Sequence, residues 1–281
     1  MHTSSINNGY FEPVHSAHSI EQVVLVLHFD RPIDQQYLSD ALVCAAQFKT
    51  LLPGVAPVLG GGIAIAFGGQ SIPMQMPPAG VVMSRSAPDG TIENELRIEQ
   101  ASITFKSTRY TRWSDIWGQA EKYYAALIGH YLDSGATLVS ISINFVDKFV
   151  WNGSAKDFSP NLLLSKDSEF VAKHIFSLED LWHIHTGAFI KSDAQTKRLM
   201  NINIDCLDEM VGLNSRRSIS ITTVLTDMFN QNGFEPLSLA QDSGEVMNFI
   251  SAHMGALHAF DKEILGKTLV ESMAKQIALI N

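Results

Sequence analysis

Residues 93–135 read ENELRIEQASITFKSTRYTRWSDIWGQAEKYYAALIGHYLDSG. The first part of this stretch alternates apolar and polar residues, as in LRIEQ and SITFK, which is typical of strands with one buried face. From Trp113 onward apolar residues recur every three or four positions, and Gly135 is a natural helix stop. The stretch therefore predicts two antiparallel strands followed by a long helix, an arrangement found in α+β folds.

The residues before this stretch predict a strand, a helix and a long connection. EQVVLVLHFD (21–30) is an apolar, β-branched run, and QQYLSDALVCAAQF (35–48) has helical spacing. Residues 51–80 are rich in Gly and Pro, and only IAIAF (63–67) predicts a strand there. VVMSRS (81–86) then completes a three-strand meander, because the turn residues APDG separate it from the next strand.

The same order of elements follows a second time. ATLVSISINFVDKFVW (136–151) alternates like a strand and is followed by an irregular stretch at 152–170. Three more strands are predicted: LWHIHTGAFIK (181–191), LMNINIDCL (199–207) and RSISITTVLTD (217–227). The apolar-periodic tail, 244–280, predicts two consecutive helices or one helix bent at Gly266. Strand, long connection, three-strand meander and helix, twice over, predict an internal duplication and an α+β protein with helices packed on antiparallel sheets.

The predicted domains follow from this order. Residues 1–20, with Ser, Asn, Gly and Pro, predict a flexible arm, residues 21–135 the first α+β half and residues 136–281 the second. No polar, Pro-rich hinge separates the halves, so we expect them to pack as one unit. Limited proteolysis is then expected to cut only in the arm and the two irregular stretches.

Composition limits the classes of function. The formal net charge is −9, which argues against a broad phosphate-binding surface. Only 17% of the residues are charged, against about 25% in soluble domains, and the apolar surface left over favours a protein partner or a homo-oligomer. Cys44 and Cys206 stand in apolar contexts and read as small buried residues rather than disulfide partners. With no signal peptide and no apolar run of about 20 residues, we expect a cytoplasmic protein without membrane contact.

Four stretches of the sequence carry a resemblance. They are PVHSAHSIEQVVLVLHFD (13–30), LRIEQASITFKSTRYTRWSDIW (96–117), VSISINFVDKFVW (139–151) and LHAFDKEILGKTLVESM (257–273). Together they resemble a sporadically distributed family of uncharacterised bacterial proteins that has no assigned function. The Gly- and Pro-rich insert at 51–80 departs from the family pattern. The resemblance implies only the fold and a bacterial origin, and it carries over no catalytic residue. A sporadic distribution of the family would suit an accessory role such as defence or a mobile-element function.

The motif HIH is a candidate metal site. In a strand His183 and His185 share one face, and a register with Ile190 opposite Met200 would place His185 opposite Asp205. Two imidazoles and a carboxylate could bind zinc or non-haem iron and serve a metal-dependent enzyme. The same residues fit a solvated face on which Asp205 accepts a hydrogen bond from His185. We expect the solvated face, because spacing places no fourth ligand.

A second candidate lies where the first meander runs into its helix. Basic and aromatic residues alternate there and could hold an anion or a single-stranded nucleic acid near a helix N-terminus. These residues are Lys106, Arg109, Tyr110 and Arg112. In the alternative, Trp113 and Trp117 fasten the helix to the sheet and the basic residues form its solvated rim.

No stretch carries a catalytic or cofactor motif. The glycines of GGGIAIAFGG lack the Lys-Ser/Thr of a phosphate loop, and no serine has the context of a nucleophile elbow. We therefore expect no cofactor and predict a non-enzymatic binding or regulatory protein that acts through protein–protein contacts. A metal-dependent enzyme and a weak nucleic-acid binder are the alternatives.

Overall fold

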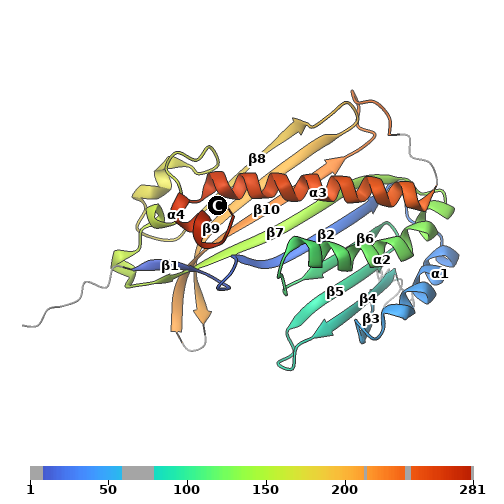
Figure 1. Ribbon diagram of the computed structural model, residues 1–281, viewed down its shortest axis with the longest axis horizontal. Coiled ribbons are helices and arrows are strands. Elements are labelled where there is room, and N and C mark those ends of the chain that lie inside the picture. Colours follow the sequence, from blue (N-terminus) through green and yellow to red (C-terminus); the bar gives the residue numbers. More distant parts are fainter. Residues whose placement is uncertain (1–8, 59–78, 212–213, 238–241, 280–281) are drawn as a thin grey trace, which may run out of the picture. The chain divides into compact units, whose positions relative to one another are not determined.

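The computed structural model divides the chain into two compact units. The first unit comprises residues 24–141 and 237–251, and the second comprises 1–23, 142–236 and 252–281. Within these ranges the structure describes residues 9–58, 79–211, 214–237 and 242–279. Antiparallel strands pack against helices in each unit (Figure 1), which confirms the α+β prediction.

The first unit contains the strands and the long helix of residues 93–135. Its elements are β2 (Ile20–Phe29, from Val24), α1 (Gln35–Ala45), η1 (Ala46–Phe48), β3 (Gly54–Val58), β4 (Gly80–Ser86), β5 (Ile92–Glu99), β6 (Ser102–Ser107) and α2 (Trp113–Asp133). Its strands lie in the order β3-β4-β5-β6-β2. The buried Tyr124 of α2 donates a hydrogen bond to the carbonyl of Leu25 (2.8 Å), and Tyr131 stacks on Phe29 with ring centroids 4.3 Å apart. Helix α2 therefore packs on β2 as well as on the meander.

The second unit is built around longer strands. Its elements are β1 (Tyr10–Pro13), β7 (Leu138–Asn152, from Ser142), η2 (Ala155–Asp157), η3 (Pro160–Leu162), η4 (Lys173–Ser177), β8 (Trp182–Lys191), β9 (Lys197–Val211), β10 (Asn214–Met228), α3 (Ser243–Thr268, from Ala252) and α4 (Glu271–Gln276). The strands lie in the order β7-β10-β9-β8, and β1 pairs with β7. Residues 252–268 of α3 cover one face, where His253 packs on Phe229 and His258 on Phe145.

The repeated order of elements is present in the structure. Strand β2, a connection, the meander β4–β6 and helix α2 come first, and β7, a connection, the meander β8–β10 and helix α3 follow in the same order. Strands β9 and β10 alternate between a buried and a wetter face as predicted, but β8 alternates only over residues 182–186. Residues 187–191 of β8 are all exposed, so period-two patterning assigns the faces of only part of this strand.

The expected flexible arm contains a strand. Tyr10–Pro13 pairs with β7 in the register Tyr10↔Asn152, and the side chain of Phe11 is buried against Trp151, with ring centroids 5.1 Å apart. Residues 1–20 are mostly polar, which favoured a flexible arm. Phe11 is apolar, and its burial stabilises the strand. Residues 1–8 lie outside the described part.

The Gly- and Pro-rich connection also contains an unexpected strand. GVAPV (54–58) forms β3 at the edge of its sheet and contains Pro57, although only IAIAF was expected to form a strand in this connection. An edge strand tolerates proline because one side of its backbone needs no partner. The strand expected at IAIAF lies outside the described residues.

The closing tail forms two helices, and the break does not fall at Gly266. Helix α3 continues through Gly266 to Thr268. The backbone N–H of Ser165 then donates to the carbonyl of Thr268 (2.9 Å), and the N–H of Val270 donates to Leu163 (2.9 Å). These bonds engage the backbone between the helices, so the chain continues as α4 from Glu271.

Candidate functional site

The two histidines of HIH lie on the predicted wet face, but the strand register differs from the expected one. Ala188, rather than Ile190, pairs with Met200, so His183 faces Asp205 and His185 faces Asn203. The turn is shorter than expected because the Asp193 carboxylate accepts the N–H groups of two turn residues, Gln195 and Thr196, both at 2.7 Å. A shift by two residues keeps every side chain on its predicted face and changes only its partner.

The geometry around this pair does not assemble a metal site. His183 and His185 are both exposed, and Asp205 is partly exposed. Among the residues that the structure describes, no three His, Cys, Asp or Glu side chains are placed to hold one ion.

We expect the purified protein to contain no stoichiometric zinc or iron, since two exposed imidazoles without further ligands bind such ions weakly. Elemental analysis by mass spectrometry after gel filtration in metal-free buffer measures this content. Stoichiometric zinc or iron that disappears in the His185→Ala variant would contradict the expectation and favour the metal-dependent enzyme.

The basic corner lies in the first unit, and two of its cations have carboxylate partners. Arg109 is paired with Glu93 (3.0 Å) and Arg112 with Asp115 (3.6 Å), although their side chains are 68% and 76% exposed. Tyr110 and Lys106 are half-buried. Arg112 is the N-cap residue of α2, and the carboxylate of Asp115 lies in the first helical turn, where it provides the negative charge that such a terminus favours. The charges of Arg109 and Arg112 at this corner are therefore compensated by carboxylates of the same unit.

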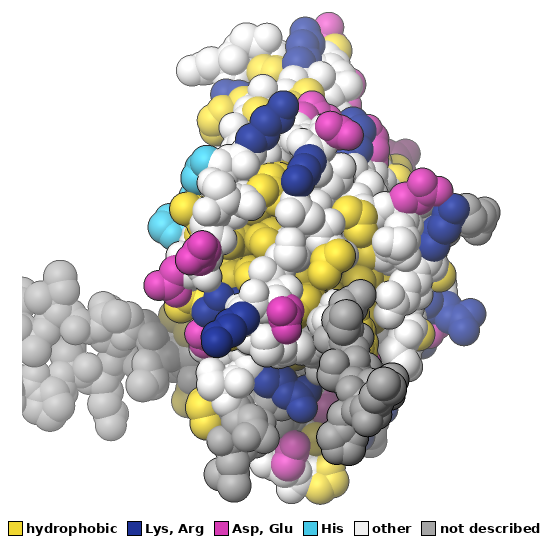
Figure 2. Space-filling model, turned by 90° about the vertical axis from the view of Figure 1, so that its left-hand side faces the viewer, with side chains coloured by type: hydrophobic (Ala, Val, Ile, Leu, Met, Phe, Trp, Pro, Cys, Tyr) yellow, Lys and Arg dark blue, Asp and Glu magenta, His cyan; other side chains and the backbone are white. Residues whose placement is uncertain are grey.

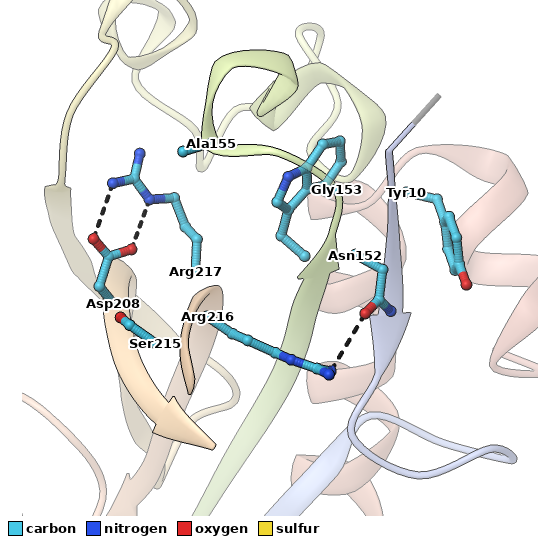
Figure 3. A pocket seen from close by; sticks show the side chains of 9 residues that line it. Tyr10, Asn152, Gly153, Ala155, Asp208, Ser215, Arg216 and Arg217 are labelled. Atoms are coloured by element: carbon cyan, nitrogen blue, oxygen red, sulfur yellow. Dashed lines mark hydrogen bonds and ion pairs between the residues drawn. The ribbon is translucent and has the colours of Figure 1, made fainter. Parts of the chain in front are cut away.

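Two neighbouring hollows lie in the second unit beside the β9–β10 hairpin. They have volumes of about 590 and 650 Å³, and both are lined by Ala155 and Arg217. The first is also lined by Tyr10, Trp151, Asn152, Gly153, Asp208, Ser215 and Arg216 (Figure 3). The second is also lined by Lys156, by residues 158–160 and by residues 176–179.

The two adjacent arginines of this region have different surroundings. Arg217 donates two hydrogen bonds to Asp208 (2.8 and 3.1 Å) and lies 5.1 Å from the centre of the Phe158 ring. Arg216 projects across the first hollow and donates one long bond, 3.4 Å, to the amide oxygen of Asn152 (Figure 3). Arg216 can therefore meet an anionic group, but one exposed guanidinium is a weak anion site.

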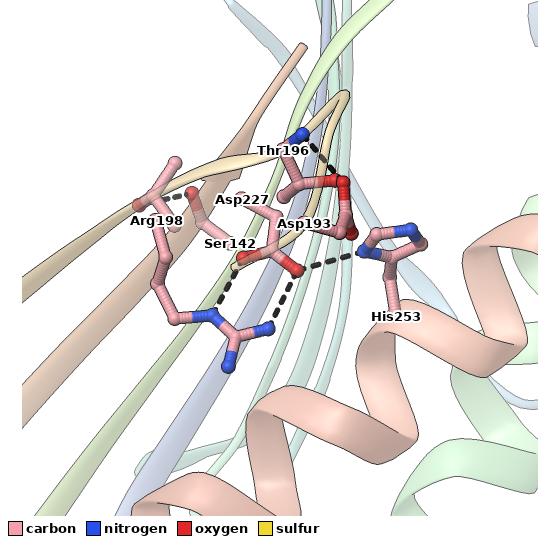
Figure 4. A network of polar contacts seen from close by, with 7 residues as sticks. Ser142, Asp193, Thr196, Arg198, Asp227 and His253 are labelled. Carbon is pink, nitrogen blue, oxygen red and sulfur yellow. Dashed lines mark hydrogen bonds and ion pairs between the residues drawn. The ribbon is translucent and has the colours of Figure 1, made fainter. Parts of the chain in front are cut away.

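A buried polar network joins three elements of the second unit (Figure 4). Asp227 of β10 is fully buried, and Arg198 of β9 donates to both its carboxylate oxygens (2.7 and 2.9 Å). Nδ1 of His253 on α3 lies 2.7 Å from the same carboxylate. Burial would raise the pKa of Asp227, but the hydrogen bonds from His253 and Arg198 outweigh it and hold the pKa below its ordinary value. This arrangement fastens α3 to the sheet.

Two further carboxyl groups are buried between the sheet and α3. Asp147 of β7 accepts a hydrogen bond of 2.5 Å from the hydroxyl of Ser19, and burial raises its pKa to about 7. Burial and the nearby Asp147 raise the pKa of Asp261 on α3 well above its ordinary value. The side chain of Thr223, a hydrogen-bonding neighbour of the Asp261 carboxyl, offsets part of this rise. Two carboxyl groups in one apolar site cannot both ionise cheaply, so protons are retained there.

Strand β8 forms an open edge of the second unit. It pairs with β9 over all ten residues without a bulge, and no other described strand lies beside it. In the described part of the chain, β9 is the only segment that forms hydrogen bonds with the backbone of residues 182–191. Phe189 is 62% exposed, and Ile190 is exposed as well. Figure 2 shows that hydrophobic side chains also lie open between charged ones on one face of the molecule.

Both cysteines are free thiols. Cys206 is buried as expected, and burial raises its pKa to about 11, whereas Cys44 is only partly buried. No helix in the described residues combines the length and apolarity needed to cross a membrane.

Comparison with known proteins adds no relative. The chain matches no family model and no curated protein.

Several residues of these sites escaped the sequence analysis. Asp147 continues the inward-facing series of β7 after Phe145, and Asp227 continues that of β10 after Leu225. A carboxylate at a core position of a strand is a signal of a buried pair, and it was available in the sequence. Arg216 and Arg217 carried no such signal. Within the described residues only Arg217 of the two is paired with a carboxylate, and that carboxylate is Asp208 on the opposite strand of the hairpin.

Proposed function

We propose that the protein is a non-enzymatic binding protein and that it acts through a protein–protein contact made by strand β8. The open edge of β8 is the observation that supports this proposal. In an antiparallel pair about half of the backbone N–H and C=O groups of an edge strand point outward, where they can accept a further strand. An accessory role in a bacterium, which a sporadic distribution of the family would suit, belongs to the same proposal.

Edge strands that stay unpaired usually carry protective features. Strand β3, the edge of the first unit, is short and contains Pro57. Strand β8 is twice as long, regular in register, and lacks proline and any charged residue before Lys191. It also exposes Phe189 and Ile190 near its end. These properties favour an edge strand that is paired with another strand when the protein functions.

The other polar clusters support a binding role over catalysis. Asp227 is paired with Arg198 and His253, and the two carboxyl groups at Asp147 and Asp261 are buried under α3. Groups held in this way stabilise a fold, whereas a catalytic group must reach a substrate.

Photo-cross-linking in the native host tests the proposal. We expect a benzophenone amino acid in place of Ala188, an exposed residue of β8, to form adducts with one defined protein segment, identified by mass spectrometry. The same amino acid in place of Val43, which is 76% exposed on α1, is the matched control and is expected to form none. Absence of a defined adduct at position 188 would contradict the proposal.

A further inference from the structure

We infer that the strand that covers β8 is the β8 strand of a second copy of this chain, paired antiparallel about a two-fold axis. The inference rests on the proposed function and names its partner. A two-fold axis places the same edge on both sides of the contact, so one pairing satisfies the outward backbone groups of both copies.

The charge pattern of β8 is compatible with this occupant. The chain has a net charge of −9, so two copies repel each other over most of their surfaces. Residues 181–190 contain no Asp, Glu, Lys or Arg, so along this strand two copies can approach without like charges meeting.

The side-chain pattern of β8 is compatible with itself when Gly187 lies on the axis. A residue that lies a given number of positions before Gly187 in one copy then stands opposite the residue that lies the same number of positions after Gly187 in the other. Paired residues point to the same face, so each face of one sheet continues into the same face of the other. Ile184 faces Ile190 on the side of the sheet that also carries Trp182, and His185 faces Phe189 on the other side. Apolar and aromatic cross-strand pairs of this kind stabilise sheets.

The charged end of the strand fits the same register. Lys191 of one copy stands opposite His183 of the other, and His183 is already opposite Asp205 on β9. The lysine, the histidine and the aspartate therefore follow each other across three strands on one face. A neutral imidazole can accept a hydrogen bond from the lysine and donate one to the aspartate, so this row of side chains is compatible with the register.

Gly187 suits the position on the axis. A Cβ atom added there would lie 2.4 Å from Oδ1 of Asn201 and 2.7 Å from the carbonyl oxygen of Met200, so the neighbouring strand β9 leaves no room for a larger residue. At the axis the two copies of residue 187 face each other directly, and glycine places no side chains between the two backbones.

The oligomeric state of the purified protein tests the inference. We expect light scattering to give twice the chain mass of 30.9 kDa for the wild type and the single chain mass for Ala188→Lys, because lysine on an edge opposes strand pairing. Val43→Lys, the same kind of change on α1, is expected to remain dimeric. A wild type that is monomeric at every concentration, or a dimer that Ala188→Lys leaves intact, would overturn the inference.

A disulfide tests the register. In the double variant Thr186→Cys and Ala188→Cys, position 186 of one copy faces position 188 of the other, so oxidation is expected to give a covalent dimer that reductant separates. Neither single variant should cross-link, and a covalent dimer from Thr186→Cys alone would contradict the register. If the purified chain is monomeric while position 188 still cross-links to a different protein in the host, the second copy is excluded as occupant and the proposed function stands.

Discussion

The Asp147→Asn variant is expected to be more stable than the wild type at neutral pH, and its advantage should grow with pH. Burial raises the pKa of Asp147 from 3.8 to about 7, so the folded protein keeps a proton that the unfolded chain releases above pH 3.8. The wild type therefore loses stability relative to the variant as pH rises from about 4 to about 7. A shift of about three pKa units corresponds to ~4 kcal/mol at most. The asparagine still accepts the hydrogen bond from Ser19 and never ionises.

The difference between the two proteins is the quantity to measure, since other groups also titrate. His258, one turn before Asp261 on α3, has a pKa lowered to about 4 by burial and by Lys262, and its effect on stability runs in the opposite direction. This effect cancels when the two unfolding free energies are subtracted at each pH. Urea unfolding from pH 4 to 8 provides them, with Asp167→Asn, the same change at an exposed site, as control. A difference that does not change with pH would show that the pair of Asp147 and Asp261 holds no proton in the folded wild type beyond those that the variant also holds.

The Asp227→Ala variant is expected to lose about 3–5 kcal/mol of unfolding free energy, the usual result of removing one partner from a buried ion pair. The side chain of Arg198 is only 11% exposed, so the variant leaves a guanidinium in the interior without its carboxylate. His253 loses the group that orients it, and the attachment of α3 to β10 weakens. Chemical denaturation at pH 7 measures the loss.

A surface ion pair provides the comparison. Glu271 and Lys275 lie four residues apart on α4 with exposed side chains, and Glu271→Ala is expected to cost less than about 0.5 kcal/mol. If Asp227→Ala costs no more than this control, the buried network contributes nothing to the fold.

Period-two and helical patterning predicted the meanders and the helices because each depends on residues close in sequence. Alternation placed His183 and His185 on the wet face, and the structure agrees. The partner of each histidine depends on the turn between β8 and β9, where the Asp193 carboxylate shortens the loop. Period-two patterning cannot detect a shift of two residues, so the register could not be read from it.

Contacts between distant segments were not predictable from local patterns. β1 depends on the burial of Phe11 against Trp151. The network of Asp227 depends on Arg198 and His253, which stand 29 and 26 residues away in the sequence. In each case one residue indicates the contact from its position in the sequence: an apolar residue in a polar segment, or a carboxylate among the buried positions of a strand. The sequence does not indicate which residue it contacts.

The pairing of β1 with β7 has a consequence for the folding of the chain. The side chains of Glu12 and Asn152, hydrogen-bonded at 2.6 Å, are 140 residues apart, whereas the hairpins of β8, β9 and β10 close over short turns. Hairpins form in microseconds, but a ribosome needs roughly 7–28 seconds to add that many residues at about 5–20 per second. During synthesis Tyr10–Pro13 therefore remains without its partner strand until Asn152 has been made. Strands β8, β9 and β10 and helix α3 of the second unit are still to be synthesised at that point, so β1 can pair with β7 before they exist.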